Sequence, residues 1–198
     1  MSAMAEPTCA TMDFTRLEIS NPVSGARGNK SAAIVDSNGQ RVVWRLPPMR
    51  PAFEPSAYGG ETDAARLTLN FRVPAEIEPD VASLDEWIVQ YCAEHSQRLF
   101  GKPLSGDQIA AMYNSPVKRH ERYGTSLRCK YVASGLGKTR FWDAEGKSRG
   151  VPESWKASDI TPRLRVASLW WVGKEFGVTM TLDDALVHVP DAEPECPF

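Results

Sequence analysis

The sequence predicts a mainly β protein with an α insertion (α+β), in which antiparallel strands close into a barrel. Apolar and polar residues alternate with period two in several runs on either side of the middle of the chain, which is typical of half-buried strands. Between residues 83 and 113 the apolar spacing changes to that of amphipathic helices. Loops rich in proline and glycine separate the runs. We therefore expect a two-helix insertion, at about residues 80–113, between two β portions.

The first strands are expected within residues 13–46. Residues 13–20 alternate weakly, and residues 31–46 have the pattern of a hairpin that turns at Asn38-Gly39. Both turn residues tolerate positive φ, so a primed turn is favoured. In the second run of this hairpin Val42, Trp44 and Leu46 share one face and are expected in the core, whereas Arg41, Val43 and Arg45 share the other face.

A loop and a second strand follow. Residues 47–60 contain four prolines and two glycines, so they are expected to form a surface loop. Tyr58 on this loop either closes over a bound strand or anchors the loop by packing. Residues 65–73 form the most amphipathic run of the chain, with Leu69 and Phe71 among the inward positions.

Two helix starts are predicted. Ser83 and Glu86 have the spacing of a capping box, and Trp87 belongs to the apolar face behind it. Gly101 ends this helix. A second capping box, Ser105 to Gln108, starts a short helix that stops before Pro116.

Three later runs, 125–134, 138–142 and 162–172, return to period two. Each places apolar residues on one side and Lys or Arg on the other. In the third run Trp170 is expected in the core and Trp171 on the surface, although a register slip of one residue would exchange them. Residues 176–189 form a last strand or strand pair, with Asp183-Asp184 at a strand end or turn.

The middle of the chain is strongly basic. Residues 115–175 carry thirteen Lys/Arg against six Asp/Glu, whereas the remainder carries ten Lys/Arg and nineteen Asp/Glu. This asymmetry is typical of a polyanion-binding surface. Cations neutralise phosphates, and flat rings stack on unpaired bases. The expected DNA contacts are Arg128, Lys130, Lys138, Arg140, Trp142, Arg163, Arg165 and Trp171, extended by Lys118, Arg119, Arg122, Trp155, Lys156 and Tyr58. A solvated sheet face is also normally charged, but its repetition in three strands favours a binding surface.

Several classes of protein are not expected. No run of eighteen or more apolar residues occurs, and no secretory signal is found. Four cysteines and three histidines are scattered, so we expect reduced thiols, no metal site and no cofactor. Gly137-Lys138-Thr139 lacks the earlier glycine of a phosphate-binding loop. No other catalytic motif is found, so the chain is not expected to be an enzyme and has no candidate catalytic residue. An intracellular location, nucleus or cytoplasm, is expected.

The last residues form an acidic segment. Residues 190–198 include Asp191, Glu193, Glu195, Pro197 and Phe198 and are expected to be a flexible tail. Such a tail either lies in the protein's own basic groove, docks its Phe into a partner protein, or is merely a ragged end. It resembles the acidic tails of bacterial single-stranded-DNA-binding proteins, which close in Pro-Phe. That resemblance implies that the five residues bind replication and repair proteins.

A second resemblance covers roughly Ser31 to Val189. It rests on the order of Val43-Trp44, Tyr58-Gly59-Gly60, Leu84-Asp85, residues 113–118, Leu127 to Lys130, Glu153 to Lys156, and Val166 to Trp170 followed by Phe176-Gly177. This order is similar to the OB-fold single-stranded-DNA-binding proteins of large double-stranded DNA viruses and related phages.

The resemblance implies an OB-like antiparallel barrel that binds single-stranded DNA with little sequence preference, in replication, recombination or repair. A loose N-terminus at 1–12, an OB-like domain at 13–189, a tail at 190–198 and a homo-oligomer are further expectations. Two alternatives stay open: an RNA-binding module, and a structural protein of a virion whose basic sheet meets an acidic protein partner.

Overall fold

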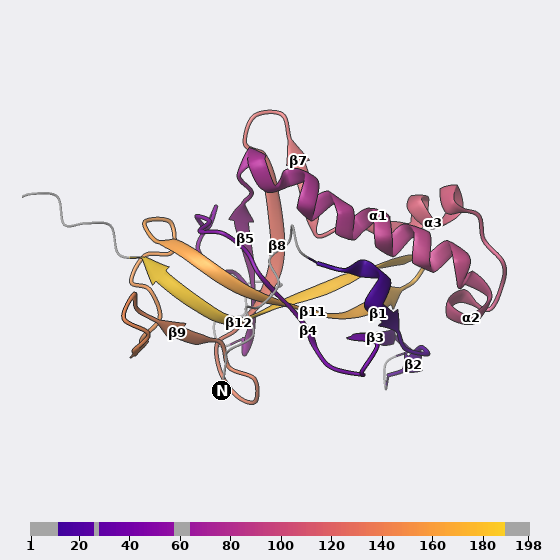
Figure 1. Cartoon of the computed structure of the whole chain (residues 1–198), viewed down its shortest axis with the longest axis horizontal. Helices are drawn as coiled ribbons and strands as arrows, with labels where there is room; N and C mark the ends of the chain where they lie inside the picture. Colours follow the sequence, from indigo (N-terminus) through magenta and orange to yellow (C-terminus); the bar gives the residue numbers. More distant parts are fainter. Residues whose placement is uncertain (1–11, 26–27, 58–63, 189–198) are drawn as a thin grey trace, which may run out of the picture.

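The two longest strands form the centre of the sheet in the computed structural model, which describes residues 12–25, 28–57 and 64–188. β11 (Asp159–Val172) and β12 (Glu175–His188) pair antiparallel along their whole length, and they cross the molecule along its long axis (Figure 1). The other strands are β1 (Leu17–Ile19), β2 (Val23–Ser24), β3 (Lys30–Asp36), β4 (Val42–Arg45), β5 (Arg66–Arg72), β6 (Tyr113–Asn114), β7 (Val117–His120), β8 (Gly124–Val132), β9 (Arg140–Trp142) and β10 (Ser148–Arg149). The protein is therefore mainly β, as predicted.

Shorter strands lie end to end along these two. β4 and β3 pair with successive parts of β11, while β8 and β9 pair in parallel with successive parts of β12. The main path runs in the order β1-β3-β11-β12-β8-β5. Among the described strands no pairing joins β1 to β5, so the observed sheet is open and mixed, and barrel closure stays a prediction.

The turn after β3 differs from the predicted primed turn. Of its residues only Gly39 has a positive φ, of 72°. The Asp36 carboxylate accepts hydrogen bonds from the backbone N–H groups of Asn38 and Gln40, at 2.9 and 2.8 Å. These bonds favour a longer loop in which Asn38 keeps a negative φ, and they leave β3 and β4 free to diverge onto β11.

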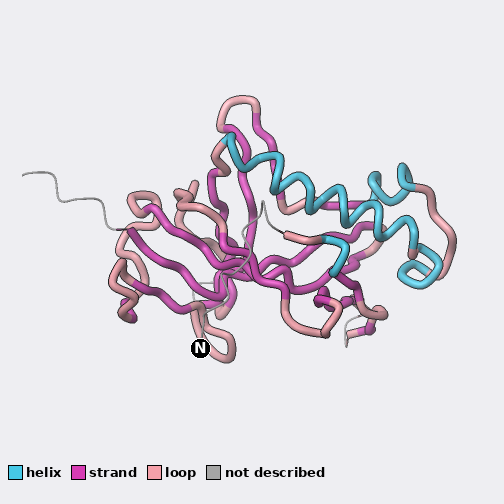
Figure 2. The backbone as a smooth tube through the Cα atoms, in the orientation of Figure 1, coloured by secondary structure: helices cyan, strands magenta, loops and turns pink. Residues whose placement is uncertain are grey.

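The helices gather on one side of the sheet (Figure 2). They are α1 (Glu78–Glu94), α2 (Ser96–Phe100) and α3 (Gly106–Met112). The predicted start of the first helix at Ser83 is wrong, because α1 begins at Glu78 with Pro79 in its first turn, where a missing N–H costs nothing. The Ser105–Gln108 capping box is confirmed.

The core lies between α1 and the inner side of the sheet. Val81, Leu84 and Ile88 are fully buried on α1, as are Trp44 and Phe71 on the strands. Near the base of β7, the hydroxyls of Tyr113 and Ser115 donate hydrogen bonds to the Asp85 carboxylate. Burial raises the pKa of Asp85. These bonds join α1 to the β7–β8 hairpin.

Substitution of Gly177 tests the packing of the central strand. A Cβ at this residue would lie 2.6 Å from the carbonyl oxygen of Asn114 and 2.6 Å from Cζ2 of Trp170. We expect Gly177→Ala to reduce the free energy of unfolding by roughly 2–3 kcal/mol, the usual cost of overpacking. The matched control is Gly106→Ala, because nothing lies within 4 Å of a Cβ there. Urea denaturation measures both variants, and equal loss in the two would contradict this packing.

Candidate nucleic-acid interface

A β-bulge in β12 places two acidic side chains on one face of the sheet. Arg163 pairs with Asp184 and Leu164 pairs with Leu182, so Asp183 is an extra residue. A bulge breaks the alternation of side chains, and both carboxylates consequently reach arginines of β11. The prediction that Asp183-Asp184 lies at a strand end or turn is wrong, since both residues are within β12.

Asp184 holds three of the predicted DNA contacts together. Its side chain is only 8% exposed. The carboxylate forms ion pairs with Nε of Arg140, at 2.8 Å, and with Nη1 of Arg163, at 3.0 Å. The Arg140 Nη2 and the Trp142 indole nitrogen also donate to it, at 2.8 and 2.9 Å. Beside it, Nε of Arg165 donates to Asp183 at 3.1 Å. Because charge-assisted bonds fix side-chain geometry, Arg140, Trp142 and Arg163 are held in one arrangement.

The strand register shows that these residues belong to one continuous surface. One row across the sheet is Arg45, Arg163, Asp184 and Arg140, from β4, β11, β12 and β9. A neighbouring row is Val43, Arg165, Thr181, Lys130 and Thr68, which reaches β8 and β5. Paired residues point to the same side of a sheet. We call the outward residues Arg45, Arg128, Lys130, Arg140, Trp142, Arg163, Arg165, Asp183 and Asp184 the basic face.

Lys130 is partly buried within this face. Its Nζ donates to Thr68 Oγ1 at 3.1 Å. Burial, together with the positive charge of Arg128, lowers the pKa of Lys130. The effect of Arg128 reflects cations gathered on one side of the sheet.

Two hollows flank the Asp184 row. One, of about 370 Å³, is lined by Arg45, Trp142, Thr161 and Leu186. The other, of about 490 Å³, is lined by Gln40, Arg41, Val43 and Asp183. Arg140, Arg163 and Asp184 border both hollows. The first hollow offers an indole ring and an apolar wall beside guanidinium groups, the combination on which a base and its phosphate can bind.

The junction of β8 and β9 depends on one buried hydroxyl. Thr139, 1% exposed, donates to the Leu182 carbonyl at 2.6 Å and accepts from the Val132 N–H at 3.1 Å. Residues 133–138 form an exposed turn between β8 and β9, and this turn carries Lys138. The strand can therefore resume beside β12 as β9, which brings Arg140 and Trp142 to the Asp184 row.

The β7–β8 hairpin carries three further predicted contacts. Lys118 pairs with Ser126, which pairs with Arg72 on β5, so Lys118 continues the side of the sheet that holds Arg128. Arg119 and Arg122 are exposed near the hairpin tip, which projects at the top of Figure 1, away from β9. Lys156 is exposed on the loop before β11.

Two of the predicted contacts are wrong as surface residues. Trp155 is 4% exposed, with ring centroids 5.0 Å from Tyr131 and 5.7 Å from Phe141. Trp171 packs on Phe176, at 6.3 Å between centroids, on the core side. A second bulge, between Val166 and Ser168, shifts the alternation of β11, so Trp170 and Trp171 exchange their expected faces. Tyr58 and the tail residues Asp191, Glu193, Glu195, Pro197 and Phe198 lie outside the described residues.

Sequence reasoning missed Arg45, Arg41 and the organising role of Asp184. The alternation of residues 41–45 did place both arginines on the face opposite Trp44. Nothing local, however, indicated that β4 would pair with β11 rather than with β3. Asp184 was missed because an acid in a basic region is normally expected to weaken polyanion binding.

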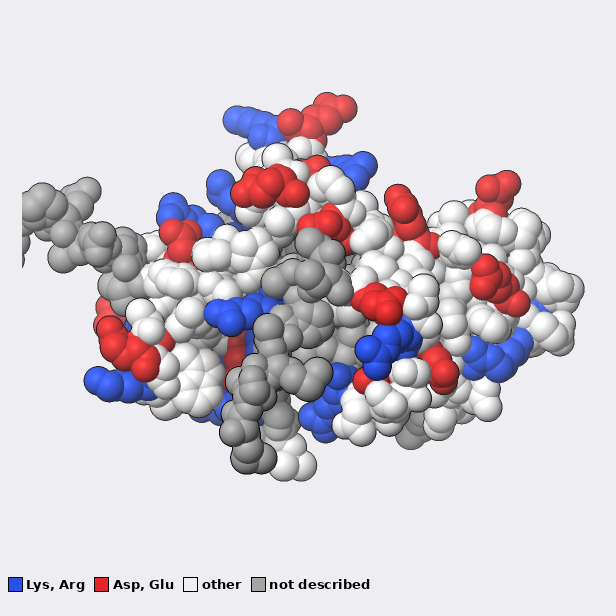
Figure 3. Space-filling view, in the orientation of Figure 1, with Lys and Arg blue, Asp and Glu red and all other residues white. Residues whose placement is uncertain are grey.

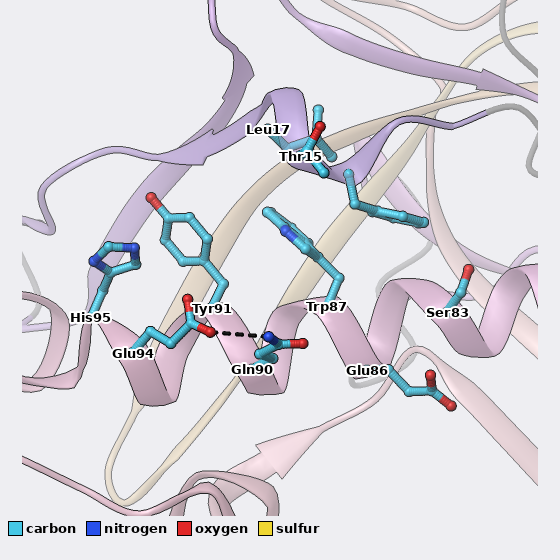
Figure 4. Close-up of a pocket in the computed structure, with 10 residues that line it drawn as sticks. Thr15, Leu17, Ser83, Glu86, Trp87, Gln90, Tyr91, Glu94 and His95 are labelled. Atoms are coloured by element: carbon cyan, nitrogen blue, oxygen red, sulfur yellow. Dashed lines mark hydrogen bonds between the residues drawn. The ribbon is translucent and has the colours of Figure 1, made fainter.

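A groove along α1 has the opposite character. It has a volume of about 480 Å³ and is lined by aromatic side chains that include Trp87 and Tyr91, with Glu86 and Glu94 at its edge (Figure 4). Residues 75–112 contain seven acids and two bases, and acidic side chains are spread over the helices in Figure 3. This side would repel phosphate.

The described part of the chain shows neither a metal-binding cluster nor a membrane-spanning helix. No group of three or more His, Cys, Asp or Glu side chains there could hold a metal ion. No helix in those ranges is long and apolar enough to cross a membrane.

No family model matches the chain, and no curated protein matches it. Among solved structures, it is similar to the single-stranded DNA-binding protein from bacteriophage Enc34 in complex with ssDNA, at 13% identity and a TM-score of 0.45, over 90% of this chain and 96% of that chain. It is also similar to gp2.5, a single-stranded DNA-binding protein encoded by bacteriophage T7, at 16% identity and a TM-score of 0.45, over 79% of this chain and 91% of that chain. Likeness at this level does not assign a function.

Proposed function

We propose that this chain binds single-stranded DNA with little sequence preference and acts in replication, recombination or repair inside the cell, without catalysis. The observation that carries the proposal is the Asp184 row, in which Arg140, Arg163 and Trp142 are held together on a continuous basic face. We further propose that residues 13–189 form an OB-like domain whose strands approach barrel closure. Lys118, Arg119, Arg122, Lys138 and Lys156 would extend the path of the strand.

The chemistry of the basic face favours unpaired strands. Its guanidinium groups can replace the counterions of phosphates, and the Trp142 ring can stack on a base of any identity. The guanidinium carbon of Arg140 already lies over that ring, 5.8 Å from the ring centroid. A duplex would present stacked base pairs, which a ring in a hollow cannot reach.

Replacement of Trp142 tests the stacking role. We expect Trp142→Ala to weaken binding of an oligo-dT by roughly 5-fold to 100-fold, because one stacked base contributes about 1–3 kcal/mol. Fluorescence anisotropy of a labelled oligonucleotide measures the change. Phe53→Ala is the matched control, since Phe53 is an exposed aromatic residue that does not belong to the basic face. A stacking role for Trp142 is excluded if both variants bind like the unaltered chain.

The RNA-binding alternative shares every feature of the basic face. Competition between matched DNA and RNA oligonucleotides separates the two, since recognition of RNA depends on its 2′-hydroxyl groups. We expect DNA to compete at least as well as RNA. A protein that binds neither would instead favour the virion role.

The acidic tail is proposed to compete with DNA for the basic face and to contact replication proteins. Deletion of residues 191–198 removes Asp191, Glu193 and Glu195. We expect it to tighten DNA binding severalfold at low salt, with the difference fading as salt screens the charges. Titration of the full and shortened chains at two salt concentrations measures this effect. Equal affinities at low salt would refute the competition.

A further inference from the structure

An apolar hollow lies at the end of the molecule where β11 turns into β12. It has a volume of about 460 Å³ and lies between α2, the loop that joins α2 to α3, and the turn at Gly173-Lys174. Its apolar lining consists of Leu99, Phe100, Leu104, Met112 and Trp171. Hollows of this size bind side chains or small ligands.

Three lysines surround this apolar lining. Lys30, Lys102 and Lys174 all line the hollow, and all three are exposed. No acidic residue lines it, and none of the three lysines forms an ion pair within the described ranges. The hollow therefore fits a segment that carries an aromatic side chain close to several carboxylates.

The chain itself contains such a segment. Residues 189–198 combine Phe198 and Pro197 with three acids, Asp191, Glu193 and Glu195. The three acids match the three lysines in number. The groove along α1, which also offers aromatic rings, is bordered by Glu86 and Glu94 and would repel this segment.

The length of residues 189–198 decides whether the segment can bind the hollow of its own chain or only that of a second copy. β12 extends from Glu175, next to the hollow, to His188, about 43 Å at the usual rise of a strand. Residues 189–198 span at most about 35 Å when fully extended. Figure 1 shows the end of β12 and its turn with β11 at opposite ends of the molecule. The segment is therefore too short for Phe198 to reach the hollow of its own chain.

We propose that residues 189–198 of one copy bind in the lysine-rimmed hollow of a second copy. Phe198 enters the apolar lining, and the acids pair with Lys30, Lys102 and Lys174. Because the two contact surfaces differ, this association is heterologous and builds either a closed ring or an open row of molecules. If the proposed DNA binding holds, neighbours on one strand meet at high effective concentration. The association itself does not depend on DNA.

Sedimentation velocity of the full-length chain without DNA tests the proposal. Self-association should increase with concentration, and Lys102→Glu/Lys174→Glu or Phe198→Ala should weaken it at least tenfold. Both lysines are exposed, so the double variant is expected to fold. Asp191→Lys/Glu193→Lys should likewise fail to associate alone but associate with the Lys102→Glu/Lys174→Glu variant on mixing, which restores opposite charges.

Arg140→Glu is the control for binding of the segment to the basic face. It should leave self-association unchanged or strengthen it, because a tail released from the basic face is free to bind a second copy. The proposal is overturned if the unaltered chain stays monomeric at all concentrations, if deletion of 189–198 leaves association intact, or if Arg140→Glu abolishes association while the lysine variant does not. Because no DNA is present, failure here leaves the proposed function standing.

Discussion

Removing Arg45 and Arg140 together should lower the affinity for single-stranded DNA about 100-fold at low salt, if each arginine contributes about one tenfold step. The two arginines lie at the ends of one row across β4, β11, β12 and β9. Arg140 is 61% exposed despite its bond to Asp184, and Arg45 is also exposed. Both can therefore meet a phosphate. Loss of Arg45 should cost little stability, whereas loss of Arg140 should lower stability because it removes a partner of the nearly buried Asp184.

The salt dependence gives a second reading of the same variant. Each phosphate contact to a single strand contributes about 0.7 to the slope of log K against log salt. Arg45→Ala/Arg140→Ala should therefore flatten the slope by about 1.4. Lys102→Ala/Lys174→Ala is the control, because it removes the same charge at the far end of the β11–β12 hairpin. Both variants are titrated with an oligonucleotide that holds a single copy, so that contacts between copies do not contribute. Equal loss in both variants would show that only net charge matters and that the basic face has no special role.

The sequence was a good guide to which residues face outward and a poor guide to how strands pair. Alternation alone predicted that Arg128, Lys130, Arg140 and Arg163 lie on the side opposite the core, and the register agrees. It could not predict the bulges at Asp183 and before Ser168, because a bulge depends on the partner strand. The exchange of Trp170 and Trp171 follows from the second of these.

The burial of Trp155 and the start of α1 also differ from the predictions, for two separate reasons. Trp155 lies on a loop, where no periodicity distinguishes a buried ring from an exposed one. Its burial results from contact with Tyr131 and Phe141, which are distant in sequence. The helix start at Glu78 was marked by Pro79 and by acids in the first turn, signals that compete with the Ser83–Glu86 capping pattern. Tertiary contacts decided the first case, and one local signal prevailed over another in the second.

The replacement Asp184→Asn should change DNA binding and stability in opposite directions. In the unaltered chain Asp184 neutralises Arg140 and Arg163. A phosphate therefore has to compete with the Asp184 carboxylate for both arginines. An amide of the same shape removes the charge and with it this competition. The slope of log K against log salt should steepen by up to about 0.7, one single-strand increment, because Arg163 becomes available while the more exposed Arg140 already contacts the strand. Affinity at low salt should rise, by about tenfold.

The Asp184→Asn replacement should also lower the free energy of unfolding. Its amide accepts hydrogen bonds less strongly than the carboxylate to which Arg140, Trp142 and Arg163 donate. Arg140, Arg163 and Trp142 all donate to Asp184, whose side chain is 8% exposed. Loss of a buried partner costs up to about 3–5 kcal/mol, but the exposure of Arg140 reduces this to roughly 1–3 kcal/mol. Asp183→Asn is the matched control, since Asp183 has one arginine partner and is less buried. Urea denaturation and titration at three salt concentrations measure both effects. An unchanged slope in Asp184→Asn would mean that Asp184 does not compete with the strand for Arg163, and the Asp184–Arg163 pair would then be structural only.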